Sequence, residues 1–189
     1  MNESNVIILG DYIEPEIVDF EGTLSFNVKA SYIEKKKIWQ SKDITAEFFG
    51  NFWENIVESP HIKSTLHFIC AELMENAVYH STTPDYMIRI QLCFKSDELM
   101  VYSINSADTK NNEEFISFIR MLLETENLQK LFIQRMKEAK KSRSKKSQVG
   151  LITMIKDRGA KLAWKLVKGK ELTKITTQAR ILLKNKETV

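Results

Sequence analysis

Glycine is scarce in this chain of 189 residues, which has only six, at positions 10, 22, 50, 150, 159 and 169. No two of these glycines lie closer than nine positions. The G-x-G-x-x-G and Walker A loops need closely spaced glycines so that backbone can approach phosphate. The sequence therefore excludes both nucleotide-binding loops in their intact form.

Cysteine, long apolar runs and excess charge are also scarce. The two cysteines, Cys70 and Cys93, rule out a disulfide scaffold and favour a cytoplasmic protein. No apolar run reaches the roughly 20 residues of a membrane helix, and the N-terminus has no secretory pattern, so we expect no membrane partner. The formal charge of +3 is too small to indicate nucleic acid as the partner.

What is present is the pattern of one globular domain. Alternating apolar residues at 88–94 and 99–104 predict an antiparallel hairpin, and 105–112 reads as a polar loop. Further strands are expected at 6–9, 24–28, 35–39, 160–167 and 175–183. Helical periodicity predicts helices over 46–57 (closed by Pro60), 62–80, 113–124, 128–141 and 150–157.

This order of elements predicts a two-layer α/β (α+β) sandwich, in which helices cover one face of a mixed, mainly antiparallel sheet. We divide the chain into an N-terminal arm or short strand over 1–22, the domain proper over 23–184, and a tail over 185–189. The oligomeric state is open, with a homodimer as one alternative.

The helix predicted over 62–80 has a polar stripe of Glu72, Asn76 and His80, each four residues from the next. At about 100° per residue these side chains drift only about 40° per step, and they border the apolar face. There a glutamate can act as a base and an asparagine oxygen can bind Mg²⁺. The alternative is a set of ordinary border residues.

Other candidate groups favour structural roles. Cys70 lies on an apolar stripe and Cys93 in a strand, so we expect core positions rather than nucleophiles. The aromatic residues Phe48, Phe49, Phe52 and Trp53 are interpreted as core or interface. Seven cations and one acid lie between 135 and 146, which suits a phosphate, an acidic protein surface or a solvated connector.

Four segments in order resemble the GHKL superfamily of ATP-binding domains. Residues 72–80 resemble its N-box, and residues 150–164 resemble its second glycine box with the helix and strand that follow. Together with 44–49 and 176–181, they are similar to small stand-alone bacterial and cyanobacterial regulators related to SiaB and to the anti-sigma-factor kinases. The resemblance covers about residues 39–183 and implies a Bergerat-type (GHKL) sandwich.

The resemblance implies roles for particular residues. Glu72 would match the catalytic base, and Asn76 the Mg²⁺ ligand on a bound ATP or ADP. Asn105 lies where the superfamily usually has the aspartate that recognises adenine, and Thr176 or Thr177 would match the threonine that supports it. Gly150 would bring a helix N-terminus to the phosphates. The partner implied is a STAS-type, anti-sigma-antagonist-like protein, phosphorylated on serine or threonine.

The sequence also departs from the superfamily pattern. Residues 105–109, where D-x-G-x-G is expected, contain no glycine, and residues 147–151 contain one where two are expected. Fewer glycines weaken close contact between backbone and triphosphate. Two functions therefore stay open: a nucleotide-binding regulator that acts as a kinase, or a degenerate, inactive scaffold that works by binding its partner.

Overall fold

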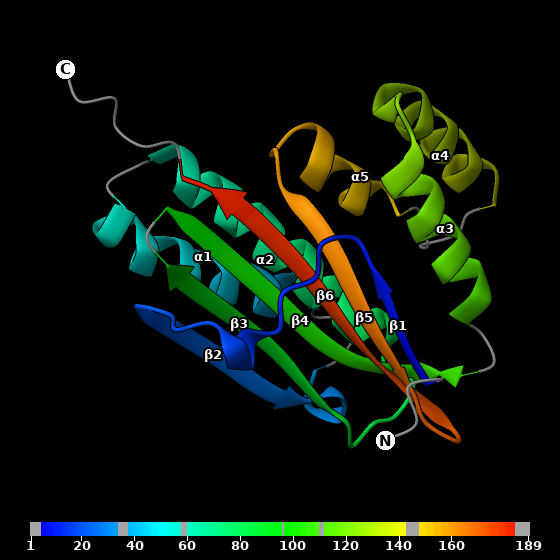
Figure 1. The fold of residues 1–189 in the computed structure, drawn as a ribbon, viewed down its shortest axis with the longest axis horizontal. Coiled ribbons are helices and arrows are strands. Elements are labelled where there is room, and N and C mark those ends of the chain that lie inside the picture. The colour runs from blue at the N-terminus through cyan, green and yellow to red at the C-terminus, as the bar shows by residue number, and fades with distance from the viewer. Residues whose placement is uncertain are drawn as a thin grey trace.

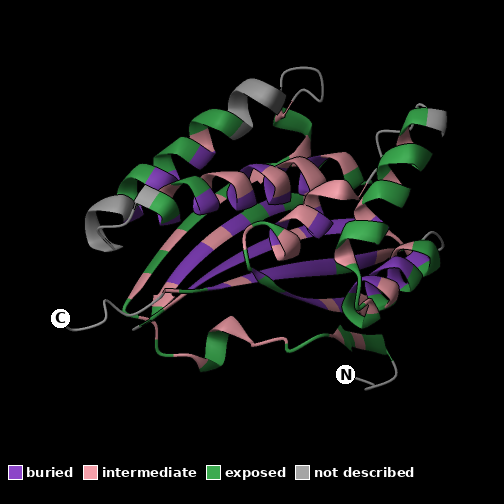
Figure 2. Ribbon diagram, turned by 90° about the horizontal axis from the view of Figure 1, so that it is seen from above, coloured by how far each residue is buried: buried purple, intermediate pink, exposed green. Residues whose placement is uncertain are grey.

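The computed structural model describes residues 5–33, 38–57, 60–95, 97–109, 112–142 and 148–183 (Figure 1). Within these residues helices and strands form two layers. The helices lie over one face of a single sheet, and a stretch of the N-terminal region crosses the other face (Figure 2). The expected two-layer α+β sandwich is confirmed at this level. Residues 184–189 lie outside the described part, as does the tail expected there.

The sheet has six strands in the order β1-β5-β6-β4-β3-β2 among the described residues. Every neighbouring pair is antiparallel, so the expectation of a mixed sheet is wrong and only its mainly antiparallel character holds. The strands are β1 (Val6–Leu9), β2 (Gly22–Lys29), β3 (Met87–Lys95), β4 (Glu98–Asp108), β5 (Lys161–Lys168) and β6 (Leu172–Leu182).

The helices of the described part differ in length and place. Two long helices, α1 and α2, pack on each other, and α2 lies directly on β3 and β4. The shorter α3 and α4 lie to one side of the sheet, with α5 between them and α2 (Figure 1). The bounds are α1 (Ile38–Val57), α2 (Pro60–His80), α3 (Asn112–Glu124), α4 (Leu128–Ser142) and α5 (Val149–Lys156).

Two sequence-based boundaries near these helices are corrected. Residues 34–37 lie outside the described part and α1 already begins at Ile38, so the strand expected at 35–39 is wrong at Trp39. Pro60 does not close a helix but begins α2. Proline is favoured at a first helical position because the amide hydrogen it lacks would have no partner there.

The hairpin expected from alternation is confirmed, with Lys95 opposite Glu98 and Arg89 opposite Ile104. Its second strand is longer than predicted: β4 continues to Asp108, paired along its length with β6. The polar loop expected over 105–112 is therefore wrong over 105–108 and at Asn112, where α3 begins, while residues 110 and 111 lie outside the described part. Asn105 lies inside a central strand, because pairing with β6 satisfies the backbone of a segment that looks too polar for a strand.

The core between the two layers is apolar. The stripe of α2, with Leu66, Ile69 and Leu73, is at most 1% exposed and packs toward Leu92 and Val101 of the sheet. Burying such side chains contributes roughly 1.5–3 kcal/mol each. This packing fixes α2 on the sheet and thereby fixes the position of its polar stripe.

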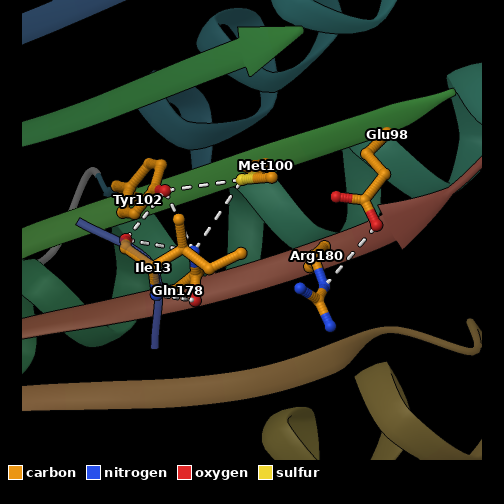
Figure 3. A network of polar contacts seen from close by, with 6 residues as sticks. All are labelled: Ile13, Glu98, Met100, Tyr102, Gln178 and Arg180. Carbon is orange, nitrogen blue, oxygen red and sulfur yellow. Dashed lines mark hydrogen bonds and ion pairs between the residues drawn. The ribbon is translucent and has the colours of Figure 1, made fainter. Parts of the chain in front are cut away.

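The outer face of the sheet is covered by the N-terminal arm, here residues 10–21. Tyr12, Ile13 and Phe20 of the arm pack over Cys93, Met100 and Tyr102. A ring of hydrogen bonds holds the arm in place (Figure 3): the Tyr102 hydroxyl donates to the Ile13 carbonyl at 3.1 Å, and Gln178 Nε2 donates to that hydroxyl at 2.9 Å. The Ile13 amide in turn donates to Gln178 Oε1 at 3.2 Å.

Candidate functional site

The fold brings Glu72 of α2 against Gly150 of α5, although 77 residues separate them in the sequence. A Cβ added at Gly150 would overlap Glu72 Oε2 and would lie 2.9 Å from the carboxyl carbon. Only glycine lets the carboxylate approach the backbone this closely. Gln148, just before α5, has a left-handed φ of 54°.

This contact places a carboxylate at the beginning of a helix. The first amide hydrogens of a helix have no partner within it, and the helix dipole gives that end a partial positive charge. The Glu72 carboxylate therefore lies where the first turn of α5 favours an anion. The same position would favour the phosphates of a nucleotide.

A row of polar side chains on β4 and β6 faces the helices inside the apolar core. Ser103, Asn105 and Thr177 are 2%, 6% and 8% exposed. Ser103 Oγ donates to the Leu73 carbonyl of α2 at 3.3 Å, and Asn105 Nδ2 donates to the Ser106 carbonyl at 3.3 Å. Buried polar groups cost free energy unless they are hydrogen-bonded. The bonds of Ser103 and Asn105 meet this requirement, and the row places polar groups on the helix-facing side of the sheet within an otherwise apolar core.

Strand geometry separates the two candidate threonines. Thr177 is paired with Ser103 and shares its helix-facing side, whereas Thr176 is paired with Ile104 and points to the outer face. There its hydroxyl lies near the Tyr12 phenol of the arm and lowers the pKa of that phenol, against the larger effect of burial. Of the two threonines, only Thr177 lies on the same side of the sheet as Asn105 and α2.

Asn76 lies one turn after Glu72 on α2 and is partly buried. This position agrees with one polar stripe along the helix. The described residues contain no group of three or more histidine, cysteine, aspartate or glutamate side chains that could hold a metal ion. Any Mg²⁺ here would therefore be held by few protein groups, with water completing its coordination shell.

Sequence reasoning missed two polar features near this region. Ser81 and Ser106 hydroxyls lie 3.4 Å apart and are buried. Asn112 begins α3 and is 4% exposed, and its Nδ2 has no hydrogen-bond partner among the described residues. Both Ser106 and Asn112 fall in the segment taken for a loop, and no local pattern distinguishes them from loop residues.

The cysteines behave as predicted, because both are buried and free. Burial raises the pKa of the Cys70 thiol to about 12. Burial also raises the pKa of Cys93, opposed by hydrogen bonds from Thr23 and Gln91. A thiol must ionise to act as a nucleophile, so burial disfavours a nucleophilic role for both residues.

Of the basic run, Arg143, Lys145 and Lys146 lie outside the described residues. Arg135 is described: it pairs with Glu138 at 3.0 Å, and its guanidinium stacks over Phe118 at 4.9 Å from the ring centroid. This arginine is thus engaged within α3 and α4.

Two surface grooves lie away from Glu72 and Gly150. The larger, about 540 Å³, is bounded by the end of β1, the turn between α3 and α4, and Lys161 and Arg180. The second, about 470 Å³, lies between α1 and α2, where Lys63, His67 and Arg158 face Glu47. The guanidinium of Arg158 is held 5.0 Å above the Phe68 ring. Neither groove is lined by a residue that the sequence assigned to the site.

No protein-family model matches the chain, and no curated protein matches it significantly. Among the described residues, no helix has both the length and the apolar character needed to cross a bilayer.

Proposed function

We propose that this chain is a regulatory protein of the GHKL type that binds an adenine nucleotide and a STAS-type protein partner. The observation that carries the proposal is the contact between Glu72 and Gly150. These residues belong to the two segments that resemble the N-box and the second glycine box, and in such a domain those boxes face one nucleotide.

The residues fit the two ends of a nucleotide unequally. Asn105 and Thr177 offer donors and acceptors for a purine base from one side of the sheet. The phosphate end has Gly150 and the first turn of α5, but the Glu72 carboxylate lies in that space. A bound Mg²⁺ would supply positive charge there, with Asn76 as its protein ligand. Glu72 would then orient or deprotonate an acceptor hydroxyl.

The same observation favours a second candidate, a scaffold that binds its partner without nucleotide. The Glu72 carboxylate already lies at the α5 N-terminus, where a phosphate would otherwise bind. Its negative charge would repel a phosphate placed beside it. The absence of glycine from residues 105–109 also weakens nucleotide binding, because the backbone cannot approach a triphosphate as closely. The two candidates differ in one measurable property, nucleotide affinity.

Calorimetric titration with ATP and ADP, each with and without Mg²⁺, separates the candidates. Micromolar binding strengthened by Mg²⁺ supports the nucleotide site and a role for Asn76. Binding that is indifferent to Mg²⁺ supports a nucleotide sensor without phosphoryl transfer. The absence of binding to all four rejects the nucleotide site and leaves the scaffold.

The adjacent threonines provide a matched control for the site. Thr177→Val should weaken nucleotide binding about tenfold, the effect of losing one good hydrogen bond. Thr176→Val makes the same chemical change on the opposite face and should leave affinity unchanged. Equal losses in both variants would mean that the nucleotide lies elsewhere.

Glu72→Ala and Asn76→Ala test phosphoryl transfer, with a purified STAS-domain protein and ATP as substrates. A kinase should lose transfer in both variants and keep it in Glu114→Ala, an exposed glutamate on α3. A scaffold should bind the STAS-domain protein equally well in all of them, within about 0.5 kcal/mol.

A further inference from the structure

Helix α1 has a second apolar side that faces solvent. Ile44, Phe48 and Phe52 are 69%, 56% and 44% exposed, and we call these three residues the α1 ridge. The rings of Phe48 and Phe52 lie 6.4 Å apart, centroid to centroid. In Figure 2 the exposed parts of α1 lie along the outside of the helical layer.

The ridge adjoins the buried side of α1, because the Phe48 ring lies 6.1 Å from that of Phe49 and the Phe52 ring lies 5.4 Å from that of Trp53, centroid to centroid. Ala46, Phe49 and Trp53 are each 1% exposed and pack into the core. At about 100° per residue, the centre of the ridge lies about 130° around the helix from the centre of these three residues. The ridge therefore extends the apolar side of α1 onto the solvent-facing surface, and a contiguous exposed apolar surface is of the kind that marks interaction sites.

Carboxylates border the ridge. Between 43 and 53 the helix has two acids, Asp43 and Glu47, and no lysine or arginine, and both acids are exposed. They lie four residues apart and therefore on one flank of the ridge. Beyond Glu47 the surface falls into the groove where Lys63, His67 and Arg158 lie, so the acidic flank separates the ridge from these cations.

The charges of Asp43 and Glu47 distinguish two proteins that could cover the ridge, a second copy of this chain and a helix of another protein. In a two-fold pair of antiparallel α1 helices, ridge would lie on ridge, and Asp43 and Glu47 of one copy would border the same flank of the other. Like charges brought together oppose that arrangement. A helix with cations along one edge gains attraction instead. An apolar ridge with a charged edge is the surface that amphipathic helices bind.

We propose that the α1 ridge is a docking surface for an amphipathic helix of another protein, with apolar residues spaced four apart and lysine or arginine along one flank. The ridge lies on a different surface from Glu72 and Gly150. This inference goes beyond the nucleotide site and does not depend on nucleotide binding.

Two fluorescent helical peptides test the proposal against the full chain by anisotropy. Both have the same leucines at every fourth position, and their flank is lysine in one and glutamate in the other. The lysine peptide should bind at least tenfold more tightly, and added salt should reduce the difference. No binding, or equal binding of both peptides, would overturn the proposal.

Variants locate the binding and control for folding. Phe48→Ser with Phe52→Ser should abolish binding while circular dichroism shows that the fold is kept, although some loss of melting temperature is expected because the Phe52 ring also packs on Trp53. Ile133→Ser on α4, where Ile133 is 43% exposed, should leave binding unchanged. Asp43→Lys with Glu47→Lys should reverse the preference between the peptides. Sedimentation of the unmodified chain and of the double serine variant tests the other occupant. If the unmodified chain is a dimer and the variant is a monomer, the ridge binds a second copy of this chain and not a helix of another protein.

Discussion

The two faces of the sheet are covered in different ways. The inner face lies under α1, α2 and α5 in one large apolar cluster that includes Leu66, Leu92 and Trp164. The outer face has a small cluster of three buried residues under a single extended arm (Figure 2). The inner face therefore depends on apolar area, and the outer face depends more on hydrogen bonds between the arm and the strands.

This contrast has a consequence for stability. Loss of apolar volume from a dense core affects the whole domain, because the surrounding atoms relax only in part. Loss of one bond between the arm and the sheet can be met by local opening of the arm. A single substitution should therefore remove more stability from the inner face than from the outer face.

The largest effect is expected from the inner face. Leu66→Ala removes a side chain that is 0% exposed at the centre of α2, which should lower the free energy of unfolding by about 2–5 kcal/mol. Urea denaturation measures it. Leu123→Ala, at a leucine that is 39% exposed, is the matched control and should cost much less. Similar losses in both would mean that α2 does not form the centre of the core.

A smaller effect is expected from the outer face. Tyr102→Phe removes the hydroxyl that donates to the Ile13 carbonyl and accepts from Gln178 (Figure 3). The Ile13 carbonyl keeps a longer bond from Gln178 Nε2 at 3.4 Å, so the variant should lose only the net value of a hydrogen bond, about 0.5–1.5 kcal/mol. Hydrogen exchange should become faster at the amides of the arm before it changes in α2. Uniform acceleration across the chain would show that the arm does not open independently.

The sequence predicted elements with strong periodicity and missed those that tertiary pairing decides. The stripe of α2 and the 88–94 and 99–104 hairpin need only local pattern. The extension of β4 through Asn105 could not be predicted from local pattern, because β6, its partner across those residues, lies about 70 positions further along the chain. Parallel and antiparallel neighbours likewise cannot be distinguished from strand pattern alone.

In the candidate site, too, local pattern predicted some features and tertiary packing decided the others. Glu72 and Asn76 could be placed on one stripe from helical spacing, but their relation to Gly150 depends on how α5 packs against α2. The choice between Thr176 and Thr177 required the register with β4, since a shift of one residue exchanges the two faces of a strand. Asn112 gave no signal, because an asparagine before a helix is common at exposed positions.

Alkaline pH should weaken the outer face. Burial, followed by the charge of Glu14, raises the pKa of Tyr12 to about 12, and burial raises the pKa of Tyr102. In the unfolded chain both phenols ionise near pH 10. Above that pH the folded state holds more protons than the unfolded state, so stability should fall as pH rises from about 10 towards 12.

Urea denaturation at pH 8 to 11 measures this slope. Tyr12→Phe removes one of the two phenols, and its stability should depend less on pH over the same range. Tyr86 also has a raised pKa through burial but lies away from the arm, so Tyr86→Phe should leave the arm's own slope in hydrogen exchange unchanged. If the arm amides exchange equally at pH 8 and 10.5 after correction for intrinsic rates, ionisation of the phenols does not control the opening of the arm.

The smallest effect is expected at the ion pair between Glu14 of the arm and Lys165 of β5, where both side chains are about one-quarter to one-third exposed. Partly solvated pairs contribute about 0–1 kcal/mol, because screening and side-chain entropy offset the attraction. Glu14→Gln keeps the shape of the side chain and removes its charge, so it should lower the free energy of unfolding less than Tyr102→Phe does. A double-mutant cycle with Lys165→Met measures the coupling directly. If that coupling exceeded the loss in Tyr102→Phe, charge rather than the hydrogen-bond ring around Gln178 would hold the arm on the sheet.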